Sequence, residues 1–255
     1  MAVNTQQDQR ARLQPKSLVP GANTGAGGAS NSTTTVNNAD GTSSSIPTND
    51  VLGPCQPDNL LYPLWSTKGV LFPYTPSIST GNVAEYDPST FIQTNYGYNA
   101  YVRSYPKPIS ITAEFTAQSN DEALYLLSVI QFFRSVTKSY FGINPYNKAG
   151  TPPPTLIFNY LGDYQFNNVP VIVKEFSYTL PADVDYVPIN TTNAQIFSTN
   201  IGVNLSPGNS GGFTWVPTHL TVQLDLDTQY IPIKLRNEFN LDLFRQGKLL
   251  NKGYI

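Results

Sequence analysis

Apolar and polar residues alternate most regularly in two segments of the chain, residues 109–117 and 219–227. A period of two places successive side chains on opposite faces of a β-strand, so both segments are predicted to be half-buried strands. The apolar positions are Ile109, Ile111, Ala113, Phe115 and Ala117, then Leu220, Val222, Leu224 and Leu226. The polar positions are Ser110, Thr112, Glu114 and Thr116, then His219, Thr221, Gln223 and Asp225.

Between these two segments the period changes to that of a helix. Ser119 and Glu122 have the spacing of a capping box, in which the serine oxygen accepts from the amide three residues on and the glutamate reaches back. The apolar residues that follow recur at helical spacing, which predicts an amphipathic helix from about 120 to 138. They are Ala123, Leu126, Leu127, Ile130 and Phe133.

The rest of the chain reads mostly as strands and loops. Extended segments are expected at 70–78 and 96–101, a strand at 155–161, and a longer strand or pair of strands within 164–180. Residues 181–213 are rich in Asn, Thr, Gly and Pro, and are predicted to be a long loop insertion. This order predicts a mainly β (α+β) fold, an antiparallel sandwich or barrel with one packed α-helix.

Three regions are expected along the chain. Residues 1–58 contain no aromatic residue and are predicted to be an extended low-complexity N-terminal arm, residues 59–228 the β domain, and residues 229–255 a C-terminal docking tail. Pro232 interrupts the last strand, and the apolar residues after it are too few to bury one another. The residues expected to dock on another subunit are Leu235, Phe239, Leu243, Phe244, Leu249 and Leu250.

Composition adds that the surface is unusual. Only 13% of the residues are charged, the net charge is -2, and Tyr, Asn, Thr and Ser are abundant. Such a surface is expected to be covered largely by protein partners. No basic cluster predicts tight binding to DNA or a membrane, and the longest apolar-rich run, residues 123–133, is too short to span a bilayer. The single cysteine, Cys55, excludes an internal disulfide.

Candidate catalytic residues are sparse. His219 is the only histidine, so a catalytic triad or a zinc site built on it lacks its usual partners. The carboxylate pairs Asp183/Asp185 and Asp225/Asp227 have the spacing for a shared strand face, but turn and strand-end positions explain them as well. We therefore predict no catalytic, cofactor-binding or metal-binding residue, no cofactor, and a protein that is not an enzyme.

Two blocks of the sequence carry a resemblance to a known family. They are residues 155–187, which include YTLPADVDYV at 178–187, and residues 216–255, which include FNLDLFRQGKLL at 239–250. Together with the helix-bearing segment 109–142 they resemble the tail-tube-like baseplate proteins of T-even-type contractile phages, which cap the baseplate hub and initiate the tail tube. The resemblance covers residues 60 to 255.

The resemblance implies a fold shared with tail tube subunits and with the tube protein of type VI secretion. Six copies would form a ring whose sheets join into one barrel around a channel, located in the virion and assembled in the host cytoplasm. Expected partners are the tail tube protein, other baseplate hub and tube proteins, the tape measure protein, sheath-side proteins and DNA in transit, with no membrane insertion. Residues expected to face the channel are Ser110, Thr112, Glu114, Thr116, Thr221, Gln223 and Asp225.

Two alternatives stay open. One is the repeating tail tube subunit itself, or a tube terminator. A repeating subunit polymerises with itself, whereas an initiator forms one ring and stops. The other is a tail protein that binds or cleaves carbohydrate. The tyrosine-rich β surface and the pair Asp225/Asp227 suggest this alternative. That alternative predicts glycan affinity that is lost on changing either aspartate.

Overall fold

The computed structural model describes residues 10–16, 31–37, 43–55, 59–89, 92–141, 150–190 and 213–255. Its centre is a seven-stranded sheet in the order β5-β1-β10-β11-β14-β9-β6, with every neighbouring pair antiparallel. The strands in that order are Val70–Leu71, Arg12–Pro15, Leu156–Tyr160, Phe166–Thr179, His219–Thr228, Ile109–Thr116 and Ser77–Ser79. The expectation of a mainly β, antiparallel fold is therefore confirmed.

The sheet is open. The two edge strands, β5 and β6, are not paired with each other among the described residues, so one chain does not close its sheet into a barrel. No closed barrel is therefore found in the described part of the isolated chain, and a sandwich or barrel shared between copies stays a prediction. Closure requires the two edges of a sheet to meet, and here seven twisted strands leave short strands of two and three residues at the two ends.

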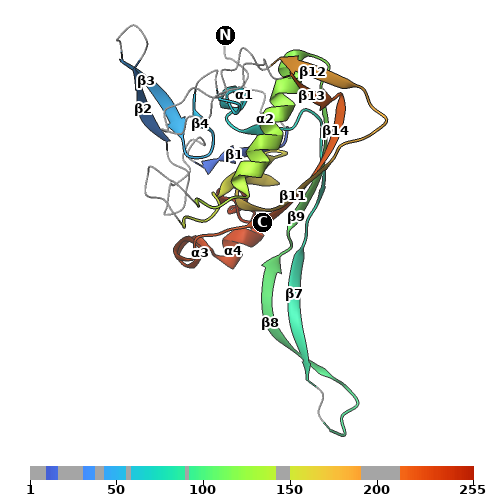
Figure 1. The fold of residues 1–255 in the computed structure, drawn as a ribbon. Helices are drawn as coiled ribbons and strands as arrows, with labels where there is room; N and C mark the ends of the chain where they lie inside the picture. Colours follow the sequence, from blue (N-terminus) through green and yellow to red (C-terminus); the bar gives the residue numbers. More distant parts are fainter. Residues whose placement is uncertain are drawn as a thin grey trace, which may run out of the picture.

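One long helix covers the apolar face of the sheet, as predicted (Figure 1). Helix α2 (Asn120–Val136) begins after Ser119, whose Oγ accepts from the amide of Glu122 at 3.3 Å. The Glu122 carboxylate accepts from the amide of Gln118 at 2.8 Å, one residue before the position that a capping box predicts. Both carboxylates of the first turn, Asp121 and Glu122, also suit the positive end of the helix dipole.

The core lies between α2 and strands β9, β14 and β11. The alternating apolar residues of β9 and β14 are at most 2% exposed, and so are most of the helix residues that face them. Phe133 of α2 stacks on Phe176 of β11 with ring centroids 5.1 Å apart, and Phe176 stacks in turn on Tyr178. Burial of this apolar surface is the main stabilising contribution to the arrangement.

The N-terminal segment departs from the expected extended arm. Strand β1 lies inside the main sheet between β5 and β10, and its neighbour Ala11 and its own Leu13 are completely buried. Residues 31–37 and 43–54 add a small sheet of β2 (Asn31–Asn37), β3 (Ser43–Asn49) and β4 (Gly53–Pro54), and the core residues Val51 and Leu52 lie in the turn between β3 and β4. The boundary predicted at residue 58 thus divides one packed unit, because the apolar residues before it pack with strands that lie far along the chain.

The segment 181–213, expected to be a loop insertion, contributes a second hairpin. Strands β12 (Tyr186–Asn190) and β13 (Phe213–Pro217) pair antiparallel, and Ile189 and Val216 are buried in the core. The remainder of the expected insertion, residues 191–212, lies outside the described residues. Ile189 and Val216 show that its ends belong to the β domain.

A long two-stranded hairpin projects from the body of the fold. Strands β7 (Asn82–Ser89) and β8 (Tyr98–Pro106) pair only with each other among the described residues, and Figure 1 shows them extending far beyond the rest of the fold. The chain enters this hairpin from β6 and leaves it into β9. We call residues 82–106 the arm.

The C-terminal segment folds back on the sheet. It contains α3 (Pro232–Glu238), α4 (Leu241–Arg245) and the short 3₁₀ helix η3 (Leu250–Lys252). The short helix α1 (Pro63–Ser66) does not belong to this segment and precedes β5. The amide of Gln229 donates to the carbonyl of Pro170 at 2.9 Å, and the Tyr230 hydroxyl donates to the carbonyl of Gly253 at 2.9 Å. These bonds fix both ends of the segment near the start of β11.

Candidate functional site

The seven residues expected to face a channel lie together on one exposed face of the sheet. Strands β9 and β14 are adjacent, and their register places Thr116, Glu114, Thr112 and Ser110 opposite His219, Thr221, Gln223 and Asp225. Directly opposed residues of an antiparallel pair share a face, so these side chains form two parallel polar rows. The other face of the same strands carries the buried apolar residues under α2. We call this exposed surface the polar face.

Two further strands widen the polar face. On β11, Glu175, Ser177 and Thr179 lie opposite Asp225, Gln223 and Thr221, and on β6, Ser77 and Ser79 lie opposite Thr112 and Ser110. All five added residues are exposed. A β-bulge between Val173 and Glu175 shifts the side-chain alternation of β11, which is why the polar positions there were not singled out. The alternation from Glu175 to Thr179 was the signal available in the sequence.

Charges on the polar face are few and mostly negative. Ser110 Oγ donates to Asp225 Oδ1 at 2.5 Å, which links the two central strands. His219 Nε2 lies 3.7 Å from Glu114 Oε2, and Lys174 Nζ lies 3.4 Å from Asp227 Oδ2, so both groups that can carry positive charge sit beside a carboxylate. The face therefore presents hydroxyl, amide and carboxylate groups and little free positive charge.

These contacts also account for the carboxylates considered as catalytic. Asp225 accepts from Ser110, and Asp227 pairs with Lys174, so each of the two has a partner within the chain. Asp183 and Asp185 are exposed, and the backbone carbonyl of Asp185 accepts from the amide of Thr218 at 2.8 Å. His219 has Glu114 as its neighbour but no nucleophile within the described contacts.

The residues expected to dock on another subunit fall into two groups. Leu235, Phe239 and Leu243 are 43%, 40% and 38% exposed, as an outward-facing surface requires. Phe244 and Leu250 are only partly exposed, while Leu249 is buried within its own chain. The expectation for Leu249 is thus wrong. Four aromatic rings close this segment on itself: Phe239 meets Phe244 and Tyr254, and Tyr254 stacks on Tyr230 at 5.3 Å.

The sequence pattern did not predict two exposed aliphatic residues that complete this surface. Ile233 is 71% exposed and Leu241 is 52% exposed, and they belong to the same two short helices, α3 and α4. Neither helix has a buried residue. We define the C-terminal surface as the exposed apolar residues Ile233, Leu235, Phe239, Leu241 and Leu243.

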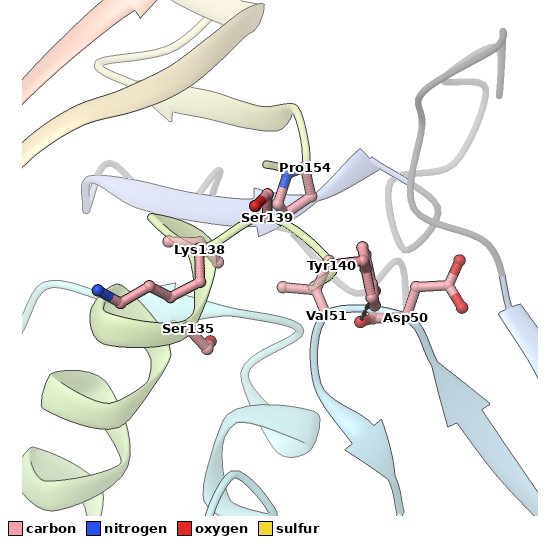
Figure 2. Close-up of a pocket in the computed structure, with 8 residues that line it drawn as sticks. Asp50, Val51, Ser135, Lys138, Ser139, Tyr140 and Pro154 are labelled. Atoms are coloured by element: carbon pink, nitrogen blue, oxygen red, sulfur yellow. Dashed lines mark hydrogen bonds between the residues drawn. The ribbon is translucent and has the colours of Figure 1, made fainter. Parts of the chain in front are cut away.

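One hollow lies at the C-terminal end of α2. It has a volume of about 320 Å³ and is lined mainly by the end of the helix and by residues 50 and 51 (Figure 2). The Tyr140 hydroxyl donates to the carbonyl of Asp50 at 2.8 Å, which joins the two sides. Figure 2 shows the side chains of Lys138 and Asp50 pointing in opposite directions. The hollow therefore lacks the convergent polar groups of a catalytic or small-ligand site.

The described residues show neither a metal site nor a membrane-spanning helix. No group of three or more His, Cys, Asp or Glu side chains there has the arrangement to hold a metal ion. None of the helices in the described part combines the length and apolar character needed to cross a bilayer. The polar face and the C-terminal surface are thus the two features with a candidate function.

No model of a known protein family fits the chain, and none of the curated proteins is significantly similar to it. The fold and its surfaces define a mainly β protein with one helix-covered sheet face and one exposed polar face.

Proposed function

We propose that this chain is a structural virion protein, a ring subunit of the baseplate hub and tube of a contractile phage tail that initiates tail tube assembly. The observation that carries the proposal is the two-sided character of the sheet: one face is packed under α2, and the other is a broad polar face over four strands. A tube wall needs this combination, since its outer side packs and its inner side stays wet.

The chemistry of the polar face suits a channel for DNA. Hydroxyl and amide groups hydrate the surface without binding phosphate, and the carboxylates Glu114, Glu175 and Asp225 repel it. Lys174 and His219 lie beside carboxylates, which lowers their attraction for a passing strand. The resemblance of residues 60–255 to tail-tube-like baseplate proteins points to the same role.

The open edge of the sheet at β6 supports assembly from several copies. β6 has no second neighbour among the described strands, and the arm that continues from it is a two-stranded hairpin. An isolated hairpin of two strands is marginal in water, and exposed edges invite pairing with another chain. A ring in which identical copies complete one another removes both problems, with six copies as the number the resemblance implies.

Electron microscopy of the purified chain tests the proposal. An annulus with a central hole is expected, and mixing it with a tail tube subunit should shorten the lag before tubes appear. Long tubes formed by this chain alone would instead support the repeating tube subunit. A monomer at all concentrations that neither forms rings nor nucleates tubes would refute both.

A further inference from the structure

The arm exposes aromatic residues on both of its faces. Five of its tyrosines and two aliphatic residues are between 43% and 92% exposed: Tyr86, Ile92, Tyr96, Tyr98, Tyr101, Val102 and Tyr105. Opposed residues of a strand pair share a face. Tyr86 and Tyr101 are opposed and lie on one face of the arm, whereas Tyr105, which is opposite Val83, lies on the other face. An aromatic surface of this size on a slender projection indicates a protein interface.

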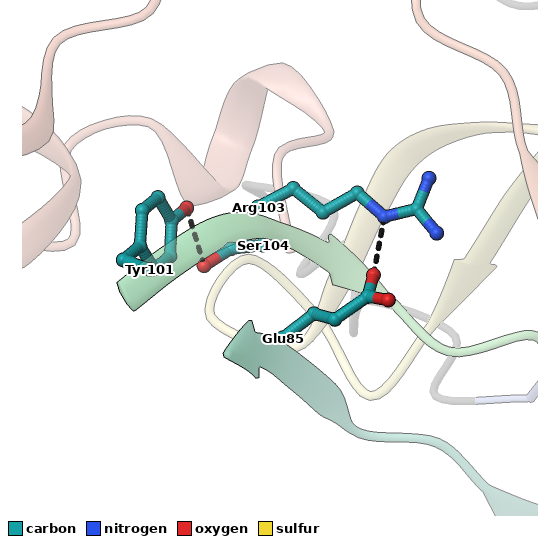
Figure 3. A network of polar contacts seen from close by, with 4 residues as sticks. All are labelled: Glu85, Tyr101, Arg103 and Ser104. Atoms are coloured by element: carbon teal, nitrogen blue, oxygen red, sulfur yellow. Dashed lines mark hydrogen bonds and ion pairs between the residues drawn. The ribbon is translucent and has the colours of Figure 1, made fainter. Parts of the chain in front are cut away.

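Contacts within the arm hold its side chains in place. Arg103 Nε donates to Glu85 Oε2 at 2.5 Å, and the Tyr101 hydroxyl donates to Ser104 Oγ at 2.9 Å (Figure 3). The Arg103 guanidinium also lies over the Tyr105 ring, 5.3 Å from its centroid, and the rings of Tyr86 and Tyr101 meet edge to face at 5.7 Å. These contacts reduce the entropy lost when the arm binds a partner.

The C-terminal surface is chemically complementary to the arm. Residues 229–255 carry five Lys or Arg and two Asp or Glu, a net charge of +3, whereas the rest of the chain has a net charge of -5. The exposed leucines and Ile233 alternate with cations such as Lys234 and Arg236. Aliphatic groups pack on tyrosine rings and cations bind over their faces, and the arm itself carries one more acidic than basic residue.

We propose that the arm of one copy packs on the C-terminal surface of a second copy of this chain. The arm leaves the body, and the residues that lead into it, Thr80 to Asn82, share a hollow of about 270 Å³ with Phe244, Leu250 and Ile255 of the C-terminal segment (Figure 1). The tyrosines further along the arm, Tyr96 and Tyr98, are 88% and 65% exposed and can meet another copy. The contact joins two different surfaces, and such head-to-tail contacts generate rings or stacks of rings. It rests on the assembly proposed above and names the surfaces that make it.

Cysteine cross-linking between two differently labelled copies tests this contact. In a Cys55→Ser background, one full-length variant carries Tyr98→Cys and a second carries Leu241→Cys, and the two are mixed before mild oxidation. A disulfide that joins the two variants is expected in the mixture. As a control, Phe141→Cys, at a position 94% exposed and outside both surfaces, replaces the arm cysteine and should give little of this product.

Substitution supplies an independent measurement. The double variants Tyr96→Ser/Tyr98→Ser and Ile233→Ser/Leu241→Ser should each weaken self-association roughly tenfold or more in sedimentation velocity, while Phe141→Ser leaves it unchanged. Assembly that persists in both double variants, without the mixed disulfide, would overturn the arm contact and leave the ring proposal standing. Wild-type protein that stays monomeric throughout would overturn the ring proposal as well.

Discussion

The Tyr125 hydroxyl forms two hydrogen bonds with the backbone of Leu71. It accepts from the Leu71 amide at 2.8 Å and donates to the Leu71 carbonyl at 2.9 Å. Leu71 lies in the edge strand β5, and these two groups point away from β1, its only strand neighbour in the described sheet. A side chain of α2 therefore occupies the backbone positions to which another strand would pair, and this edge is protected.

Removing the hydroxyl tests how much this contact contributes. Tyr125→Phe removes both hydrogen bonds from the half-buried backbone of Leu71, so we expect the free energy of unfolding to fall by about 1–3 kcal/mol. Urea denaturation measures the change. Tyr62→Phe is the matched control, because Tyr62 is 42% exposed and should lose less than about 0.5 kcal/mol. Equal effects of the two variants would contradict the assigned role.

Gly253 fixes the end of the C-terminal segment. Its φ is +84°, and a Cβ there would lie 2.3 Å from the carbonyl oxygen of Asn168. We expect Gly253→Ala to detach the last residues and to make them more sensitive to carboxypeptidase. Gly162→Ala is the control, since Gly162 has φ +82° but open space around it. Thermal denaturation should show Gly253→Ala to be less stable by about 1–3 kcal/mol beyond the shared backbone strain. The prediction fails where the two variants unfold alike.

Tyr230 predicts a loss of stability at alkaline pH. Burial raises the pKa of Tyr230 to about 12, from roughly 10 for an exposed tyrosine. The folded state thus holds the proton more tightly than the unfolded state, so this contribution to stability is complete below pH 10 and disappears between pH 10 and 12.

Urea midpoints at pH 8 and pH 11 measure this effect. Tyr230→Phe cannot ionise, so its midpoint should fall less between the two pH values than that of the wild type. The variant also loses the hydrogen bond to the Gly253 carbonyl, which should lower its stability at pH 8 by about 1 kcal/mol. Burial raises the pKa of Tyr125 and Tyr254 as well, and these residues are common to both proteins. Parallel losses in the two proteins would exclude Tyr230 as the cause.

Charge reversal on the polar face tests its proposed position in a DNA channel. Glu114→Lys/Asp225→Lys replaces two carboxylates on neighbouring strands by cations that bind phosphate. Phage assembled with this variant should release its DNA at least about twofold more slowly, as measured by dye fluorescence after triggering. Asp183→Lys/Asp185→Lys makes the same charge change at exposed positions outside the polar face and should leave release unchanged. Unaltered release by both variants would refute the placement.

Local patterns in the sequence determined the central part of the fold. Alternation in residues 109–117 and 219–227 predicted the strands β9 and β14 and separated their buried and polar sides, and the period of 3.6 with its cap predicted α2. These features depend on neighbours a few residues apart, so the order of residue types is enough to specify them. The polar rows of β9 and β14 were found for the same reason.

Tertiary structure alone decided which distant segments meet. Leu13 is buried because its strand β1 pairs with both β5 and β10, and the end of the chain packs on β11 where Gly253 permits a close approach to Asn168. The bulge in β11 and the projection of the arm likewise depend on pairing between separate strands. Strand pairing joins residues far apart in the chain through backbone groups that every residue carries, so the pattern of side chains marks a strand but does not name its partner.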